Sequence, residues 1–144
     1  MNANYKPLFP RLGAAITRLP AGTLTILTIL AILWLTLAPD PLPSTGMKLF
    51  PGADKVVHAC MFGGLFFMVY LDRDGTYRKR RIRWNPAQRM QFTIFAAMGC
   101  ALFGGAIELA QDADWLDFVA DGAGVALAAV LTPWIVRRLF TGGN

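Results

Sequence analysis

The chain has 144 residues, of which 55% are hydrophobic and 16% are charged. Soluble domains average roughly 45–50% apolar and about 25% charged residues, and a domain this small cannot bury the excess apolar surface. The composition therefore excludes an ordinary soluble domain and a disordered chain, and it predicts a single membrane domain over residues 1–144. The formal net charge of +5 fits nucleic acid, anionic lipid or membrane orientation, so the positions of the charges must decide among them.

Four long stretches of the chain carry no charged residue. They hold 21, 16, 18 and 15 residues and lie at 19–39, 56–71, 90–107 and 122–136. A membrane-spanning helix needs about 20 mostly apolar residues. The last three stretches are shorter, so we expect their helices to continue past the charged boundaries and to include His58, Glu108 and Asp121. The pattern predicts an all-α, four-helix integral membrane bundle with helices at about 20–38, 55–71, 91–111 and 117–136.

Twelve of the 14 Lys and Arg residues fall in the N-terminal arm, in a basic loop at 72–90 and at the C-terminus. Positive residues in short loops favour the cytoplasmic side, so both termini and the basic loop are predicted to be cytoplasmic. The loop could also bind anionic lipid headgroups. No nucleic-acid recognition module accompanies these charges, so membrane lipids are the predicted partners and nucleic acid is not.

Small residues recur at helical spacing along three of the predicted helices, which predicts close helix packing. They are Ala59 and Gly63, Ala101 and Gly105, and Ala120, Gly124 and Ala128. The two cysteines, Cys60 and Cys100, lie inside apolar runs and indicate neither a disulfide nor a paired-cysteine metal site.

Ionisable side chains inside a membrane are costly, so each one is a candidate functional residue. Here they gather toward the predicted outer ends of three helices. Residues spaced i, i+3 or i, i+4 share a helix face. Three such pairs are present: Asp54 with His58, Glu108 with Gln111, and Asp117 with Asp121. Because these faces also carry the small residues, we expect a shared polar pocket at the outer end of the bundle.

Several chemistries could use this pocket. His58, Glu108 or Asp121 could act in acid/base catalysis. The same groups could bind a polar headgroup or a glycan. A third interpretation is a buried hydrogen-bond network that only aligns the helices. These residues form no recognised ligand motif, so neither a metal site nor a cofactor is predicted.

The order of these motifs resembles the VanZ-like family of small bacterial membrane proteins, over about residues 30–132. The matching features are Leu37-Ala38-Pro39, a proline-rich loop, Asp54-Lys55-x-x-His58, Glu108-x-x-Gln111 and Asp117-x-x-Ala120-Asp121-Gly122-x-Gly124. The resemblance implies a multi-pass protein of the bacterial cytoplasmic membrane, associated with the cell envelope and with resistance to the glycopeptide teicoplanin. It also implies a ligand site at Asp54, Lys55, His58, Glu108, Gln111, Asp117 and Asp121.

The sequence departs from the family pattern in two places. Family members often carry Arg and Ser ahead of the last helix, where this chain has residues 112–116, and many have Asn in place of Asp121. The predicted pocket is therefore more acidic, and a lipid phosphate would need Lys55 or a metal to offset its charge. We expect a non-enzymatic envelope protein that binds or shields a lipid-linked or cell-wall component, such as a lipid-linked cell-wall precursor. The alternatives are a membrane-embedded hydrolase or transferase, and a scaffold subunit that forms a homo-oligomer or joins a membrane complex.

Overall fold

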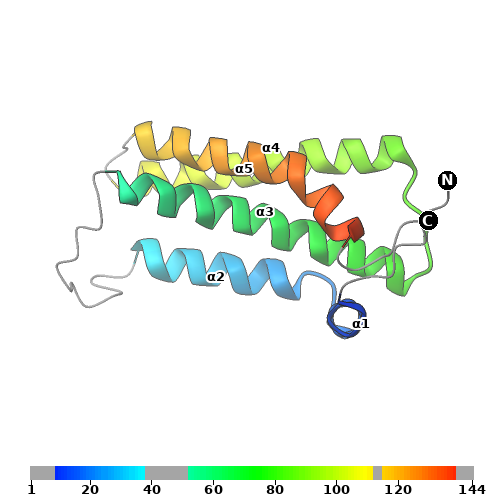
Figure 1. The fold of residues 1–144 in the computed structure, drawn as a ribbon. Helices are drawn as coiled ribbons and strands as arrows, with labels where there is room; N and C mark the ends of the chain where they lie inside the picture. The colour runs from blue at the N-terminus through cyan, green and yellow to red at the C-terminus, as the bar shows by residue number, and fades with distance from the viewer. Residues whose placement is uncertain (1–8, 38–51, 112–114, 139–144) are drawn as a thin grey trace.

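The computed structural model describes residues 9–37, 52–111 and 115–138. Every regular element in these ranges is a helix: α1 (Pro10–Arg18), α2 (Thr23–Leu37), α3 (Ala53–Lys79), α4 (Pro86–Ala110) and α5 (Trp115–Val136). The predicted all-α class is thus confirmed for the described residues. α2 to α5 form a bundle in which α3 contacts every other helix, and α1 lies across one end (Figure 1). The predicted proline-rich loop and residues 112–114 lie outside the described residues.

Three of the helices, α3, α4 and α5, are long and apolar enough to cross a membrane. Large apolar side chains cover their outward faces, and Leu102, Leu109 and Val130 are 72%, 80% and 75% exposed. α2 has only 15 residues, which is too short for a membrane span by itself. α1 and α2 together are long enough only if they are counted as one span broken by an 85° bend. By length and composition, the described residues therefore hold three candidate spans, or four with the bent pair.

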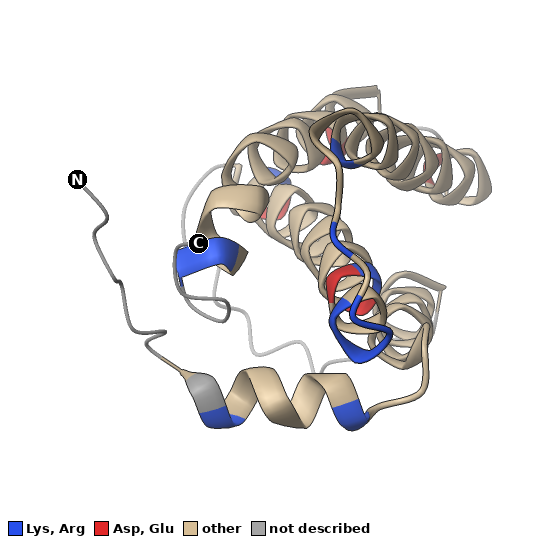
Figure 2. Cartoon of the chain, turned by 90° about the vertical axis from the view of Figure 1, so that its right-hand side faces the viewer, with Lys and Arg blue, Asp and Glu red and all other residues tan. Residues whose placement is uncertain are grey.

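The helix α1 was not predicted, because its charged residues mark the N-terminal arm as the boundary of the first apolar stretch. α1 is separated from α2 by a turn that contains Pro20 and Gly22, and Gly22 has a φ of +86°. Glycine adopts this left-handed conformation without the steric cost that other residues meet. Ile16 of α1 packs against α3 at Gly75, where a Cβ atom would lie 3.2 Å from the Ile16 side chain. α1 therefore crosses the end of the bundle as a separate helix (Figure 2).

The closest helix contact is between α3 and α5, along the small residues that the sequence analysis singled out. A Cβ atom at Gly124 would lie 2.1 Å from the Ala59 carbonyl oxygen, and one at Gly63 would lie 3.0 Å from the Gly124 carbonyl oxygen. The predicted packing role of these residues is confirmed at this contact. Gly105 serves differently, because it faces the Phe118 ring rather than a helix backbone.

The predicted basic loop at 72–90 is wrong in its extent. α3 continues to Lys79 and α4 begins at Pro86, so the connector consists of residues 80–85. Charged residues do not end a helix, and no residue between 72 and 79 interrupts the backbone hydrogen bonds of α3. The start of α4 is fixed by a capping box in which the Asn85 side chain accepts from the Ala87 and Gln88 amides, while the Gln88 side chain accepts from the Asn85 amide.

Charge is unequally distributed between the two ends of the bundle. The basic residues of α1, of the α3–α4 connector and of the end of α5 lie together at one end (Figure 2). At the opposite end lie the start of α3, the end of α4 and the start of α5, which carry Asp54, Glu108 and Asp117. We call these the basic end and the acidic end.

A carboxylate of α3 caps the first turn of α2. Asp72 Oδ2 accepts from the Thr25 amide at 2.7 Å and from the Thr25 hydroxyl at 2.6 Å, while Asp72 Oδ1 lies 3.4 Å from the Leu24 amide nitrogen. The first amides of a helix have no partner within it, so these bonds tie α2 to α3.

We expect Asp72→Ala to destabilise the α2 attachment by about 1–2 kcal/mol, the usual cost of losing such a cap. Thr25→Val is the matched control, because it removes the hydroxyl bond and keeps the amide bond. Hydrogen exchange of the α2 amides should become faster in Asp72→Ala than in Thr25→Val. Equal exchange in the two variants would contradict the capping role.

Candidate functional site

The acidic end brings together side chains from three helices. Lys55 and His58 lie in the first two turns of α3, Glu108 lies in the last turn of α4, and Asp117 and Asp121 lie in the first two turns of α5. The prediction that these helices extend past their charged boundaries is confirmed. The carboxylate of Asp117, in the first turn of α5, is favoured by the partial positive charge of the helix N-terminus.

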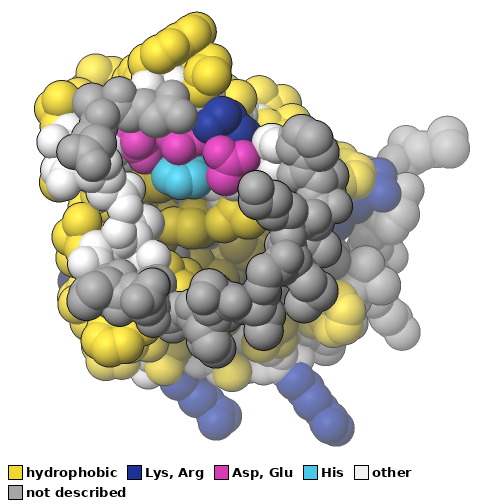
Figure 3. All heavy atoms as spheres, turned by 90° about the vertical axis from the view of Figure 1, so that its left-hand side faces the viewer, with side chains coloured by type: hydrophobic (Ala, Val, Ile, Leu, Met, Phe, Trp, Pro, Cys, Tyr) yellow, Lys and Arg dark blue, Asp and Glu magenta, His cyan; other side chains and the backbone are white. Residues whose placement is uncertain are grey.

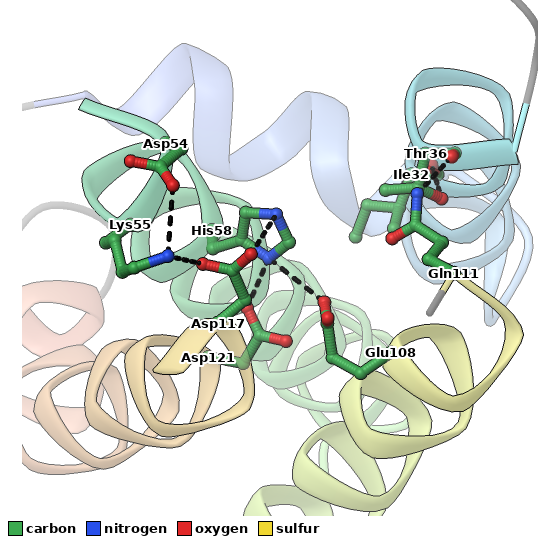
Figure 4. A network of polar contacts seen from close by, with 9 residues as sticks. All are labelled: Ile32, Thr36, Asp54, Lys55, His58, Glu108, Gln111, Asp117 and Asp121. Atoms are coloured by element: carbon green, nitrogen blue, oxygen red, sulfur yellow. Dashed lines mark hydrogen bonds and ion pairs between the residues drawn. The ribbon is translucent and has the colours of Figure 1, made fainter. Parts of the chain in front are cut away.

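His58 is the centre of this polar cluster, and its two ring nitrogens face different carboxylates (Figure 4). Nδ1 lies 3.1 Å from Asp121 Oδ1 and 3.4 Å from Glu108 Oε1, while Nε2 lies 4.0 Å from Asp117 Oδ2. A neutral imidazole donates from one nitrogen and accepts at the other. The short contact to Asp121 fits a ring that donates from Nδ1 and leaves Nε2 as the basic nitrogen.

Lys55 supplies the positive charge of the cluster. Its Nζ donates to Asp117 Oδ1 at 2.5 Å and to Asp54 Oδ2 at 3.0 Å. Among the described residues, the cluster sets one ammonium group, which binds Asp117, against the three carboxylates of Glu108, Asp117 and Asp121, and with a neutral imidazole the formal net charge of these groups is −2. An excess of negative charge at the end of an apolar bundle is unfavourable unless a cation or a hydrogen-bond donor offsets it.

The side chains of the cluster are progressively less exposed toward the middle of the bundle. The exposed fraction is 17% for His58, 15% for Asp117, 7% for Glu108 and 0% for Asp121. The histidine and acidic side chains beside it are visible from the acidic end, at the edge of a hollow with hydrophobic side chains inside it (Figure 3). The cluster can therefore be reached from this end of the molecule, while Asp121 forms its buried floor.

A glycine makes the buried position of Asp121 possible. Gly104 lies one helical turn before Glu108 on α4, and a Cβ atom at Gly104 would be 2.9 Å from Asp121 Oδ2. Gly104 was not among the residues predicted for the site. Its i, i+4 spacing to Glu108 was the signal that could have found it.

Two of the seven predicted site residues lie outside the cluster. Asp54 has a 59% exposed side chain and contacts Lys55 rather than His58. Gln111 points away from Glu108, and its amide donates to the Thr36 carbonyl oxygen, which joins the end of α4 to α2 (Figure 4). The structure brings together Lys55, His58, Glu108, Asp117 and Asp121.

An apolar groove of about 470 Å³ opens beside the cluster, between α4 and α5. It is lined by Leu102, Gly105, Ala106, Glu108, Leu109, Trp115 and Phe118. Glu108 is the only ionisable residue among these, and its carboxylate also contacts His58. The polar cluster and the apolar groove therefore share the Glu108 side chain. This arrangement was not predicted from the sequence.

The two cysteines have no part in this site. Both are free, with Cys60 exposed and Cys100 buried. The predicted absence of a disulfide is confirmed, since both residues lie in described helices.

Comparison with protein-family models, with curated proteins and with solved structures found no match for this chain. The resemblance to the VanZ-like family therefore stays a prediction from its motifs.

Proposed function

We propose that this protein is a VanZ-like, multi-pass protein of the bacterial cytoplasmic membrane that binds a lipid-linked component of the cell envelope. The apolar chain of the ligand lies in the α4–α5 groove, and its polar head reaches the cluster around His58. The proposal rests on the location of Glu108, which lines the groove and also contacts His58. Sites for amphiphiles combine an apolar surface with a few fixed polar groups in this way.

The proposed orientation places both termini and the basic end in the cytoplasm, with α2, the second half of the bent α1–α2 pair, making the first of four crossings. Its support is the gathering of Lys and Arg at the basic end, because such residues favour the cytoplasmic side. α1 then lies at the inner membrane surface, at 85° to the helix that follows it. The acidic end faces outward, where lipid-linked envelope precursors and glycopeptide antibiotics meet.

The groove gives a direct test of ligand binding. Ala106 lies on an exposed face of α4 and lines the groove, so Ala106→Trp should fill it, whereas Ala126→Trp places the same bulk on an exposed part of α5 that does not line it. The full-length protein in lipid nanodiscs is exposed to a photoactivatable polyprenyl-phosphate lipid, with photoactivatable phosphatidylcholine as the comparison lipid. We expect the polyprenyl probe to label α4 and α5 preferentially, and labelling to fall several-fold in Ala106→Trp but not in Ala126→Trp.

Equal labelling by the two lipids, or equal labelling in the two variants, would contradict the proposal. In cells, the corresponding readout is the teicoplanin concentration that stops growth of a susceptible bacterium with and without this chain. The family resemblance leads us to expect a higher concentration with the wild-type chain than with Ala106→Trp.

A second candidate function, a membrane-embedded hydrolase or transferase, is favoured by the contact between His58 and Asp121. A carboxylate that holds one imidazole nitrogen leaves the other nitrogen oriented as a general base. Release of a cleaved head group from the same polyprenyl probe, lost in His58→Gln, would favour the enzyme over the binding protein.

A further inference from the structure

We propose that the cluster at the acidic end is a binding site for one divalent transition-metal ion of the zinc or manganese type, held by His58, Glu108 and Asp117 with Asp121 as a fourth ligand. This goes beyond the proposed lipid binding and does not depend on it. One nitrogen of His58 and one carboxylate oxygen each of Glu108 and Asp117 lie within 4.8 Å of one another. An ion of this type lies about 2.0–2.2 Å from each of its ligand atoms. Small side-chain movements would therefore bring these three atoms within coordination distance of one ion.

The buried oxygen of Asp121 is an independent reason to place a cation here. Asp121 is fully buried, and its Oδ2 has no hydrogen-bond partner among the described residues. Figure 4 shows this oxygen on the Glu108 side of the cluster. Buried polar atoms nearly always have a partner, so an unpartnered carboxylate oxygen on the Glu108 side of this cluster calls for a bound group. A cation satisfies it, whereas an anion would add to the charge.

Charge supports the same conclusion. Among the described groups of the cluster, Glu108, Asp117 and Asp121 carry three negative charges against one positive charge on Lys55, and a divalent cation would bring the formal net charge of these four groups from −2 to zero. Lys55 binds Oδ1 of Asp117, which leaves Oδ2, the oxygen nearer to His58, to the metal. Lys55 would then hold the ligand in place from behind, as the groups that surround a metal's ligands commonly do.

The ligand types indicate which metal fits. Calcium and magnesium prefer sites made of oxygen ligands alone, while an imidazole combined with carboxylates suits zinc or manganese. The exposed fractions of 17% for His58 and 15% for Asp117 leave these two ligands accessible from the acidic end. A metal held there would also offer a phosphate group a direct ligand position.

The test uses the purified full-length protein in detergent, freed of metal with a chelator and titrated calorimetrically with Zn²⁺, Mn²⁺ and Mg²⁺. We expect Zn²⁺ or Mn²⁺ to bind one ion per chain, and Mg²⁺ to bind far more weakly. Glu108→Gln and Asp121→Asn keep the side-chain shape and should each weaken binding by at least about 10-fold. Asp54→Asn is the matched control, because it removes one carboxylate at the same end that lies outside the ligand set.

Elution as a single species and an unchanged helix content establish that each variant is folded. Absence of a saturable site in the wild-type protein overturns the proposal. So does an equal loss of affinity in Asp54→Asn and in Asp121→Asn, because it would indicate general attraction to negative charge. Metal binding without polyprenyl labelling would uphold this proposal and reject the proposed function, and the reverse result would do the opposite.

Discussion

Replacing Gly124 with alanine is expected to separate α5 from α3. The new Cβ atom would lie 2.1 Å from the carbonyl oxygen of Ala59 and 2.7 Å from the Ala59 Cα atom. These are backbone atoms, so no side-chain rotation can relieve the overlap, and one of the two helices must move. Overpacked cores usually lose about 1–3 kcal/mol and occasionally more. We expect a loss at the upper end of this range in the free energy of unfolding in detergent.

Gly122 provides the control on the same helix. A Cβ atom at Gly122 meets nothing within 4 Å, so Gly122→Ala should be neutral or should stabilise the helix by up to about 1 kcal/mol through helix propensity. Both variants make the same chemical change two residues apart. Similar thermal stability of the two variants would show that the α3–α5 contact does not depend on a close approach of the backbones.

Much of this fold could be predicted because its elements are apolar and separated by charge. The all-helical class, the presence of three of the long helices and the small-residue contact followed from composition and spacing. The helix ends did not follow. α3 runs eight residues further than the predicted end at 71, because Asp72, Arg73 and Asp74 mark where polarity begins rather than where the backbone changes.

α1 was missed for a related reason. Its apolar residues are too few to register as a membrane span, and its role appears only when Ile16 meets Gly75 in another helix. Contacts between residues about 60 positions apart cannot be read from a local pattern. The capping box at Asn85 was, by contrast, a local signal of the start of α4 that the sequence analysis did not use.

The candidate site was predictable in membership but not in geometry. Helical spacing placed His58, Glu108 and Asp121 on faces that pack together, and the structure joins them. Spacing also paired Asp54 with His58, yet Asp54 lies beside Lys55 at the exposed edge. The rotation of each helix about its own axis decides which of two neighbouring side chains faces the cluster. That rotation is set by packing throughout the bundle.

The expectation that no metal binds rested on the absence of a recognised ligand motif. Such motifs exist where two or more ligands come from one helix or turn. Here α3, α4 and α5 each contribute one member of the grouped set of His58, Glu108 and Asp117. A site of this kind has no local signature, so only the three-dimensional arrangement brings it into view.

Removing the imidazole of His58 is expected to destabilise the protein strongly. His58→Ala leaves the fully buried Asp121 without the ring that contacts its Oδ1 at 3.1 Å. If the contact were an ordinary hydrogen bond between helices, its loss would cost about 0.6 kcal/mol on average. A buried charge that is left uncompensated when its partner is removed costs about 3–5 kcal/mol. We expect a value near the larger figure, measured as the free energy of unfolding in detergent without added metal.

Asp121→Asn should have the opposite effect, because it keeps the shape of the side chain while removing one of three neighbouring carboxylates. We expect stability equal to or above that of the wild-type protein in the absence of metal. The double variant His58→Ala, Asp121→Asn should therefore regain most of the stability that His58→Ala loses, as coupled neighbours do in a double-mutant cycle. If each single variant lost stability and the double variant lost the sum of the two, the cluster would be a hydrogen-bond network that only aligns the helices. Recovery would show that the carboxylate at position 121 is retained at a cost to the fold, which is the behaviour of residues kept for binding.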